Sequence, residues 1–192
     1  MISRVFTIVT LLIISTVALS EDLKSHGDWI VHHATGLSAK NRGALAATIT
    51  NDITFGFECR ADTSQAWIFI NFEGNINEYK EKIYTISIGD KATRPLIGYP
   101  IQKNSNYVSI RLTSIGNDSI DESFRLLQSS KKPVDVILES HNSNNKNEQP
   151  QVFYYTISSK GSTKALTEVQ HACRQTSFTG MHVSKETLKK TS

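Results

Sequence analysis

The chain has 192 residues and a mass of 21.4 kDa, with 39% hydrophobic and 20% charged residues. This size accommodates one ordinary globular domain and excludes a large multi-domain enzyme. The hydrophobic share argues against a disordered chain, and a formal net charge of +3 gives no reason to expect nucleic-acid binding.

The first twenty residues have the three parts of a secretory signal peptide. Arg4 supplies the positive region, residues 5–17 form an apolar stretch, and Ala18-Leu19-Ser20 is a small-x-small cleavage site. An uncleaved membrane anchor is the alternative, but a spanning helix needs about 20 apolar residues and this stretch is shorter. We therefore expect an exported protein that begins at Glu21 and has no membrane span after cleavage.

The first half of the mature chain is typical of an antiparallel β domain, because short runs of β-branched and aromatic residues alternate with polar or glycine-bearing turns. Within one run, Phe55, Phe57 and Cys59 share a face and should point into the core. The predicted strands are residues 29–33, 44–50, 54–59, 66–72, 83–88, 96–102 and 107–112.

The second half predicts two helices and a β-hairpin. Ser119 and Glu122 form a capping box before apolar residues at helical spacing, and Pro133 ends that helix. A second helix follows the hairpin. The predicted ranges are a helix at 119–129, strands at 134–138 and 153–157 around a mobile polar loop at 140–151, and a helix at 162–175.

These elements predict a single α+β domain over residues 21–175. It should consist mainly of an antiparallel β-sheet or sandwich, with two short helices and one disulfide. A signal peptide at 1–20 would precede it. A flexible tail at 176–192 would follow, because that segment has little to bury.

The two cysteines, Cys59 and Cys173, both belong to the exported part, and an even pair in an oxidising compartment usually forms a disulfide. The crosslink would close a loop of roughly 110 residues, which the chain-entropy model values at about 4 to 5 kcal/mol. A catalytic cysteine is the alternative. His171 lies two residues before Cys173 and so points about 200° away from it on a helix, which argues against that pairing.

Metal and catalytic signatures are missing from the sequence. His32 and His33 are adjacent on a predicted strand and point to opposite faces, and the other histidines lack the spacing of metal ligands. No G-x-S-x-G elbow, S-x-x-K motif or phosphate-binding glycine loop is present. We expect neither a metal nor a cofactor.

The strand at 66–72 gives the main hint of a binding surface. Trp67 and Phe69 share one face with Asn71, while the opposite face is apolar as well. The favoured interpretation is a central strand covered on both sides, by a second sheet and by a helix. Alternatively, Trp67 and Phe69 contact a partner, with Tyr155 as a further candidate.

The order of landmarks resembles a group of small exported bacterial proteins. The landmarks are Gly27-Asp28-Trp29, the Phe57-Glu58-Cys59 strand, Phe124-Arg125-Leu126-Leu127, the strand at 153–157 and the cysteine-bearing helix at 165–173. This arrangement is similar to the type VI secretion accessory proteins called TagO and, more loosely, to invasion-associated locus B proteins. The resemblance implies an exported, non-enzymatic protein and assigns no binding residue.

Two functions follow from these patterns. The first is a non-enzymatic periplasmic or secreted bacterial protein that binds another envelope or host protein, as a virulence-associated accessory to a secretion or host-interaction system. The alternative is a small hydrolase or inhibitor of an envelope polymer, with a groove near Trp67 and Glu58 or Asp62 as its carboxylate.

Overall fold

The structure is a computed structural model that describes residues 23–33, 43–50, 53–61, 63–89, 95–104, 106–114, 119–145 and 148–179. The expected signal peptide and cleavage site lie outside these ranges. So do residues 180–192, which make up most of the expected tail.

The described residues form one ten-stranded sheet, two α-helices and a short 3₁₀ helix. In chain order the elements are β1 Leu23–His26, β2 Trp29–His33, β3 Gly43–Thr50, β4 Ile53–Arg60, β5 Ala66–Glu73, η2 Ile76–Glu78, β6 Lys82–Ile88, β7 Leu96–Asn104, β8 Tyr107–Ser114, α2 Ser119–Ser129, β9 Val134–Asn142, β10 Gln151–Ile157 and α3 Ser162–Cys173.

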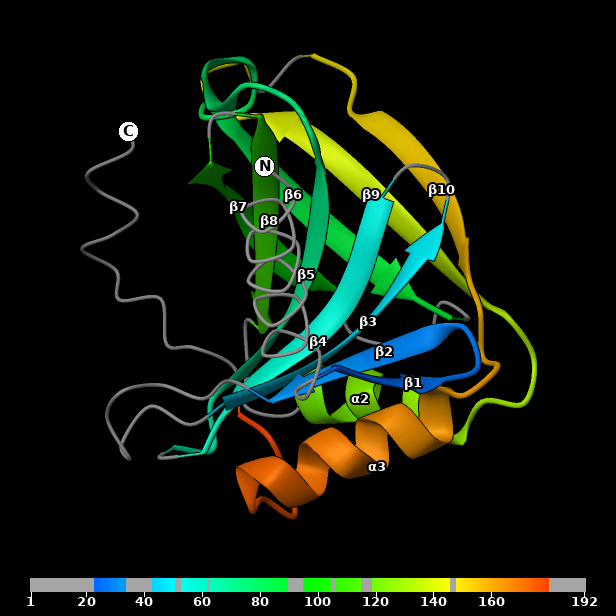
Figure 1. Cartoon of the computed structure of the whole chain (residues 1–192). Coiled ribbons are helices and arrows are strands. Elements are labelled where there is room, and N and C mark those ends of the chain that lie inside the picture. Colours follow the sequence, from blue (N-terminus) through cyan, green and yellow to red (C-terminus); the bar gives the residue numbers. More distant parts are fainter. Residues whose placement is uncertain are drawn as a thin grey trace, which may run out of the picture.

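The sheet curves into a half-barrel. Its strand order is β1-β2-β3-β4-β5-β8-β7-β6-β9-β10, and neighbouring strands are antiparallel. The two helices lie together at one end of the curved sheet, with α3 beneath the first strands (Figure 1). We call the face that carries the core and the helices the inner face, and the opposite face the outer face.

The predicted fold class is confirmed, with two differences. The described segments contain a single sheet, so no second sheet packs on the strand at 66–72. The sequence reasoning also missed β1. Its Leu-Lys-Ser-His sequence carries one large apolar residue, and it becomes a strand only by pairing with β2 as the sheet edge.

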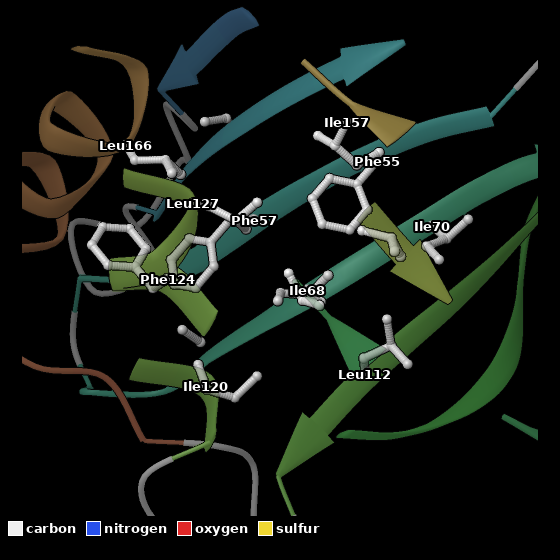
Figure 2. Packing of buried hydrophobic residues seen from close by; sticks show 14 of the residues in the cluster. Phe55, Phe57, Ile68, Ile70, Leu112, Ile120, Phe124, Leu127, Ile157 and Leu166 are labelled. Carbon is white, nitrogen blue, oxygen red and sulfur yellow. The ribbon is translucent and has the colours of Figure 1, made fainter. Parts of the chain in front are cut away.

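Aromatic rings from distant segments meet in the core. Phe57 of β4 lies 4.7 Å from Phe124 of α2 and 5.0 Å from Phe178, measured between ring centroids. The predicted inward face of β4 is confirmed, since Phe55, Phe57 and Cys59 are all buried. Figure 2 shows side chains of both helices pointing toward these strands. The core therefore lies between the helices and the inner face.

The hairpin loop is shorter than predicted. The hairpin itself is confirmed, but β9 extends to Asn142 and β10 begins at Gln151, which pairs with Ser140. Expecting a loop from residue 140 was wrong, because a polar composition does not prevent backbone pairing when a neighbouring strand, here β6, supplies the other edge.

The chain after α3 is anchored where we expected it to be frayed. Phe178 is 1% exposed, and its N–H donates to Asp121 Oδ1 at 3.0 Å. Thr179 forms backbone hydrogen bonds with Ser64 and Ala66. The tail therefore begins no earlier than residue 180, because one aromatic side chain fixes the preceding turn in the core.

The predicted disulfide is present. Cys59 of β4 is bonded to Cys173 at the end of α3, with 6.3 Å between their Cα atoms. This distance lies within the usual range for disulfides. The bond fastens the C-terminal end of α3 to the end of β4, the fourth strand in the sheet order.

The other end of α3 is fixed by two glycines that lie back to back. Gly27, in the β1–β2 turn, and Gly161, before α3, both have positive φ, at +62° and +93°. A Cβ on Gly161 would lie 1.6 Å from the His26 carbonyl oxygen, so only glycine fits there. The Asp28 N–H donates to the Lys160 carbonyl at 2.9 Å, which joins the turn to the helix start.

Candidate functional site

The side chains of β5 alternate between the two faces, as its sequence predicts. Ile68 and Ile70 are fully buried on the inner face. Trp67, Phe69 and Asn71 lie on the outer face, yet they are only 5–8% exposed. The centre of the outer face is thus a buried layer of side chains above the sheet.

The Phe69 ring packs directly against Gly56. Gly56 is its partner on β4, and a Cβ at that position would lie 2.3 Å from the Phe69 Cζ atom and 2.7 Å from the Ala46 carbonyl oxygen. The missing side chain lets the ring lie across β4. Any other residue at position 56 would displace the ring.

Trp67 contacts both members of a charged pair, Glu58 and Arg111. Its indole N–H donates to Glu58 Oε2 at 2.9 Å, and the Arg111 guanidinium lies 4.8 Å from the centre of the indole ring. Arg111 Nη2 also lies 3.8 Å from Glu58 Oε2. The carboxylate and the guanidinium largely neutralise each other, so this part of the surface has little net charge.

A hollow of about 220 Å³ opens between these side chains on the outer face. Its walls combine aliphatic and aromatic groups with a carboxylate, a guanidinium, an amide and a hydroxyl. The lining residues are Leu45, Glu58, Phe69, Asn71, Ile101, Ser109 and Arg111. They come from five adjacent strands, β3, β4, β5, β7 and β8, which makes the hollow part of the rigid sheet.

Asn71 is the unusual residue of this hollow. It is 8% exposed and lies between Thr54 and Ser109 on the neighbouring strands. Its Oδ1 atom is buried and has no hydrogen-bond partner within the described part of the chain. Leaving a buried acceptor unpaired costs about 1 to 3 kcal/mol, so such groups are rare in folded proteins.

Some of the residues singled out in the sequence lie at the hollow. Phe69 and Glu58 line the hollow, and Trp67 lies beside it as the hydrogen-bond partner of Glu58. Tyr155 does not join them, because it lies on the inner face of β10 and packs against the core. Asp62 lies outside the described residues.

The polar wall of the hollow was not predicted. Asn71 was noted only as a neighbour of Trp67, although an asparagine in the middle of an apolar strand is itself a signal. Ser109 and Arg111 on β8 and Ile101 on β7 gave no local signal, since only the strand order brings them to Asn71.

The hollow provides binding groups rather than an assembled catalytic set. Glu58 is the one carboxylate among its lining residues, whereas hydrolysis of a glycosidic bond usually employs two. In the segments that the structure describes, no group of three or more histidine, cysteine or acidic residues could hold a metal ion. The hollow can bury an apolar group and exchange hydrogen bonds.

A second polar cluster fastens α3 to the sheet. Glu168 accepts from Lys24 Nζ at 2.7 Å and contacts the Nε2 atoms of His33 and His26 at 2.7 and 2.8 Å. Partial burial of Glu168 opposes ionisation, but hydrogen bonds from Lys24, His33 and His26 outweigh it and lower the pKa of Glu168 to about 2. This cluster is structural, because its carboxylate is fully engaged.

No described helix is long and apolar enough to span a membrane. No protein-family model matches the chain, and no curated protein does. Among solved structures, it is similar to the crystal structure of invasion associated protein B from Bartonella henselae, with 12% identity and a TM-score of 0.47 over 83% of this chain and 99% of that one. That name is similar to the name of the second group in the sequence resemblance, and at this TM-score the likeness assigns no family to the chain. The likeness to TagO proteins stays a prediction.

Proposed function

We propose that this chain is an exported, non-enzymatic protein that binds a partner protein through the outer face of its sheet. The disulfide between Cys59 and Cys173 supports export, since such bonds persist in oxidising compartments. The expected signal peptide supports it as well. The partner would be an envelope or host protein in the same compartment.

The observation that carries the proposal is a set of exposed apolar side chains around the hollow. Ile49 is 74% exposed, and the other members are 38–46% exposed. Their cross-strand partners place all of them on the outer face. We call this set the outer patch: Ile30, Ile49, Ile101 and Tyr107.

The outer patch fits one kind of partner surface. Aliphatic and aromatic groups surround a partly enclosed hollow, and the one charged pair at its rim, Glu58 and Arg111, is internally balanced. Protein interfaces have this arrangement at their centre, where an apolar anchor fills a pocket and charged residues are depleted. The complementary partner is an uncharged segment with an apolar side chain.

Photo-crosslinking tests this proposal. A photoreactive residue is placed at position 49 on the outer patch or at position 171, which is exposed on α3 at the opposite face. Position 49 should give one discrete adduct in the native envelope or secreted fraction, and position 171 should not. The purified partner should then bind the wild-type protein and bind Ile49→Lys at least tenfold more weakly. Equal binding of both proteins would overturn the proposal.

The hydrolase or inhibitor alternative has one observation in its favour. Glu58 lies at the hollow, beside Trp67, as that hypothesis requires. Loss of an activity on peptidoglycan or peptides in Glu58→Gln, with the fold intact, would support this alternative against the binding protein.

A further inference from the structure

We propose that two copies of this chain pair through β10, with their β10 strands antiparallel and related by a two-fold axis at Phe153. The inference goes beyond the proposed function, because it concerns an edge of the sheet rather than its outer face. It starts from backbone groups of β10 that no described strand uses.

The backbone of alternate β10 residues points away from the rest of the sheet. β10 is the last strand in the sheet order and lies beside β9 (Figure 1). The Asp135 carbonyl of β9 accepts from the Gly89 N–H at 2.7 Å, so the backbone of Asp135 faces β6 and not β10. Asp135 lies opposite Thr156. Because bonded and non-bonded pairs alternate along antiparallel strands, the N–H and C=O groups of Thr156, Tyr154 and Val152 point away from β9.

The open part of this edge ends at Thr156. There the hydroxyl of Thr50, on β3, donates to the Thr156 carbonyl at 3.2 Å. Within the described segments, the edge-facing groups of Val152 and Tyr154 take part in no backbone hydrogen bond. Their N–H and C=O groups are therefore available to another strand along residues 151–155.

β10 lacks the protection that sheet edges usually carry. Its sequence, Gln-Val-Phe-Tyr-Tyr-Thr-Ile, contains no charged residue and no proline. β1, at the other end of the sheet, has four residues and carries Lys24. Short length and lysine are common means of preventing contact between edges, whereas a longer uncharged edge strand is a template for pairing with another chain. The sheet thus has one protected edge and one that is open to pairing.

A second β10 fits this edge in one particular register. When Phe153 lies opposite Phe153 of the second copy, Val152 lies opposite Tyr154 of that copy and Tyr154 lies opposite its Val152. These are the two residues with available backbone groups, so each Val152–Tyr154 pair exchanges both of its N–H···O=C bonds. No like charges meet across the pairing, because the strand has no charge.

The exposed side chains of β10 are complementary in the same register. Val152 is 38% exposed and Tyr154 is 72% exposed, both on the outer face. Pairing places the valine of each copy against the tyrosine ring of the other, and a β-branched residue opposite an aromatic one is a favourable cross-strand pair. On the inner face, Phe153 packs against the core and meets its own copy. The groups that β10 exposes therefore cover each other.

The ends of the paired segment match as well. Pro150 would lie opposite Thr156 of the second copy and has no N–H to donate. The Thr156 carbonyl needs no donor there, because it already accepts from Thr50. Since a two-fold axis uses the β10 edge of both copies, the assembly closes at a dimer.

The paired segment is short, so the dimer should be weak. We expect a Kd on the order of 100 µM. Unfolding measurements on protein at a few micromolar would then report on the monomer.

Sedimentation equilibrium of the mature protein tests the pairing. Between about 5 and 500 µM, the average mass should rise from that of the monomer toward that of the dimer. Tyr154→Pro removes an N–H that faces the edge and takes no hydrogen bond from β9, so this variant should stay monomeric. A wild-type protein that stays monomeric at about 500 µM would overturn the inference, and so would a Tyr154→Pro protein that associates like wild type.

Two exposed tyrosines provide a matched comparison. Tyr154→Ala removes the ring that covers Val152 of the second copy and should weaken association at least about fivefold. Tyr107 is 46% exposed and lies on β8 in the interior of the sheet. Tyr107→Ala should therefore leave the Kd within about twofold of wild type. Equal effects of the two substitutions would contradict a dimer through β10.

Engineered cysteines test the register. Phe153→Cys places a thiol on the two-fold axis, where facing Cα atoms are about 4.5 Å apart and within reach of a disulfide. Gln151→Cys is the control, because Gln151 lies opposite Tyr155 and more than about 10 Å from its own copy. Under mild oxidation Phe153→Cys should give a covalent dimer on a non-reducing gel, and Gln151→Cys should not. The reverse result would overturn the proposed register.

The same experiments separate the dimer from the proposed function. If association depends on Tyr154 and no other protein is crosslinked from position 49, the dimer stands and the protein-binding function fails. If another protein is captured from position 49 and the wild-type chain stays monomeric, the function stands and the dimer fails.

Discussion

The two faces of the sheet differ in how one buried polar side chain on each is paired. On the inner side of the sheet, Thr48 is 2% exposed and its hydroxyl donates to the Asp28 carbonyl at 2.8 Å. On the outer side, Asn71 is almost as buried, but its Oδ1 has no partner among the described residues. The hydrogen bond of Thr48 accounts for the inner arrangement, whereas no contact of the described residues compensates the burial of the Asn71 oxygen.

The inner side is also fastened more strongly. A disulfide, a carboxylate cluster and a pair of glycines hold α3 against β1–β4. The outer face instead carries exposed aliphatic side chains around a hollow. We therefore expect the inner side to provide most of the stability, and the proposed binding surface lies on the outer face.

The largest effect is expected for Phe178→Ala. This side chain contacts Phe57 and Phe124 in the core, and removing a buried phenylalanine typically costs about 3 to 5 kcal/mol. Urea unfolding measures the loss. Tyr154→Ala is the control, because Tyr154 is 72% exposed on the outer face and should change stability by less than about 0.5 kcal/mol. A small loss of stability in Phe178→Ala would contradict this anchoring and would support the frayed tail that the sequence predicts.

Loss of the disulfide should come next. Cys59→Ser and Cys173→Ser should each destabilise the protein by about 3 kcal/mol, because each removes the same crosslink. The double variant should be no less stable than either single variant. Unfolding under non-reducing conditions checks this, and strictly additive losses would contradict the pairing.

Acid should weaken the attachment of α3. The pKa of Glu168 is about 2 in the folded protein, compared with 4.5 for the free side chain. Because the folded pKa is the lower one, the stabilisation is complete above about pH 4.5 and is lost as the pH falls toward 2. The loss should be about 1 to 3 kcal/mol. The free energy of unfolding at pH 5 and at pH 2.5 measures this loss. Glu168→Gln should lose less stability between the two pH values than the wild-type protein. An equal loss in both proteins would be inconsistent with this role of Glu168.

Much of the fold could be predicted from local patterns. The alternation in β4 assigned Phe55, Phe57 and Cys59 to the core, and the even cysteine count predicted the disulfide. Three features depended on tertiary partners instead. β1 needs β2, the end of β9 needs β6, and Phe178 needs a space between Phe57 and Phe124. β2 follows β1 after only two residues, whereas β6, Phe57 and Phe124 lie far in sequence from the segments that need them.

The candidate site was predicted only in part, for the same reason. The residue types on β5 indicated a surface near Trp67, but the sequence does not show that β8 lies beside β5. That neighbour supplies Ser109 and Arg111. The unpaired state of Asn71 is also a property of its surroundings, so no local pattern reveals it.

The most direct test of this account compares two substitutions that remove a buried polar group from opposite faces. Asn71→Leu removes an acceptor that stabilises nothing in the unbound protein, so the free energy of unfolding should stay unchanged or rise by about 1 kcal/mol. Thr48→Val removes a made hydrogen bond and should lower it by about 1 to 2 kcal/mol. If Asn71→Leu is destabilised as much as Thr48→Val, the outer amide serves the fold and the contrast between the two faces is wrong.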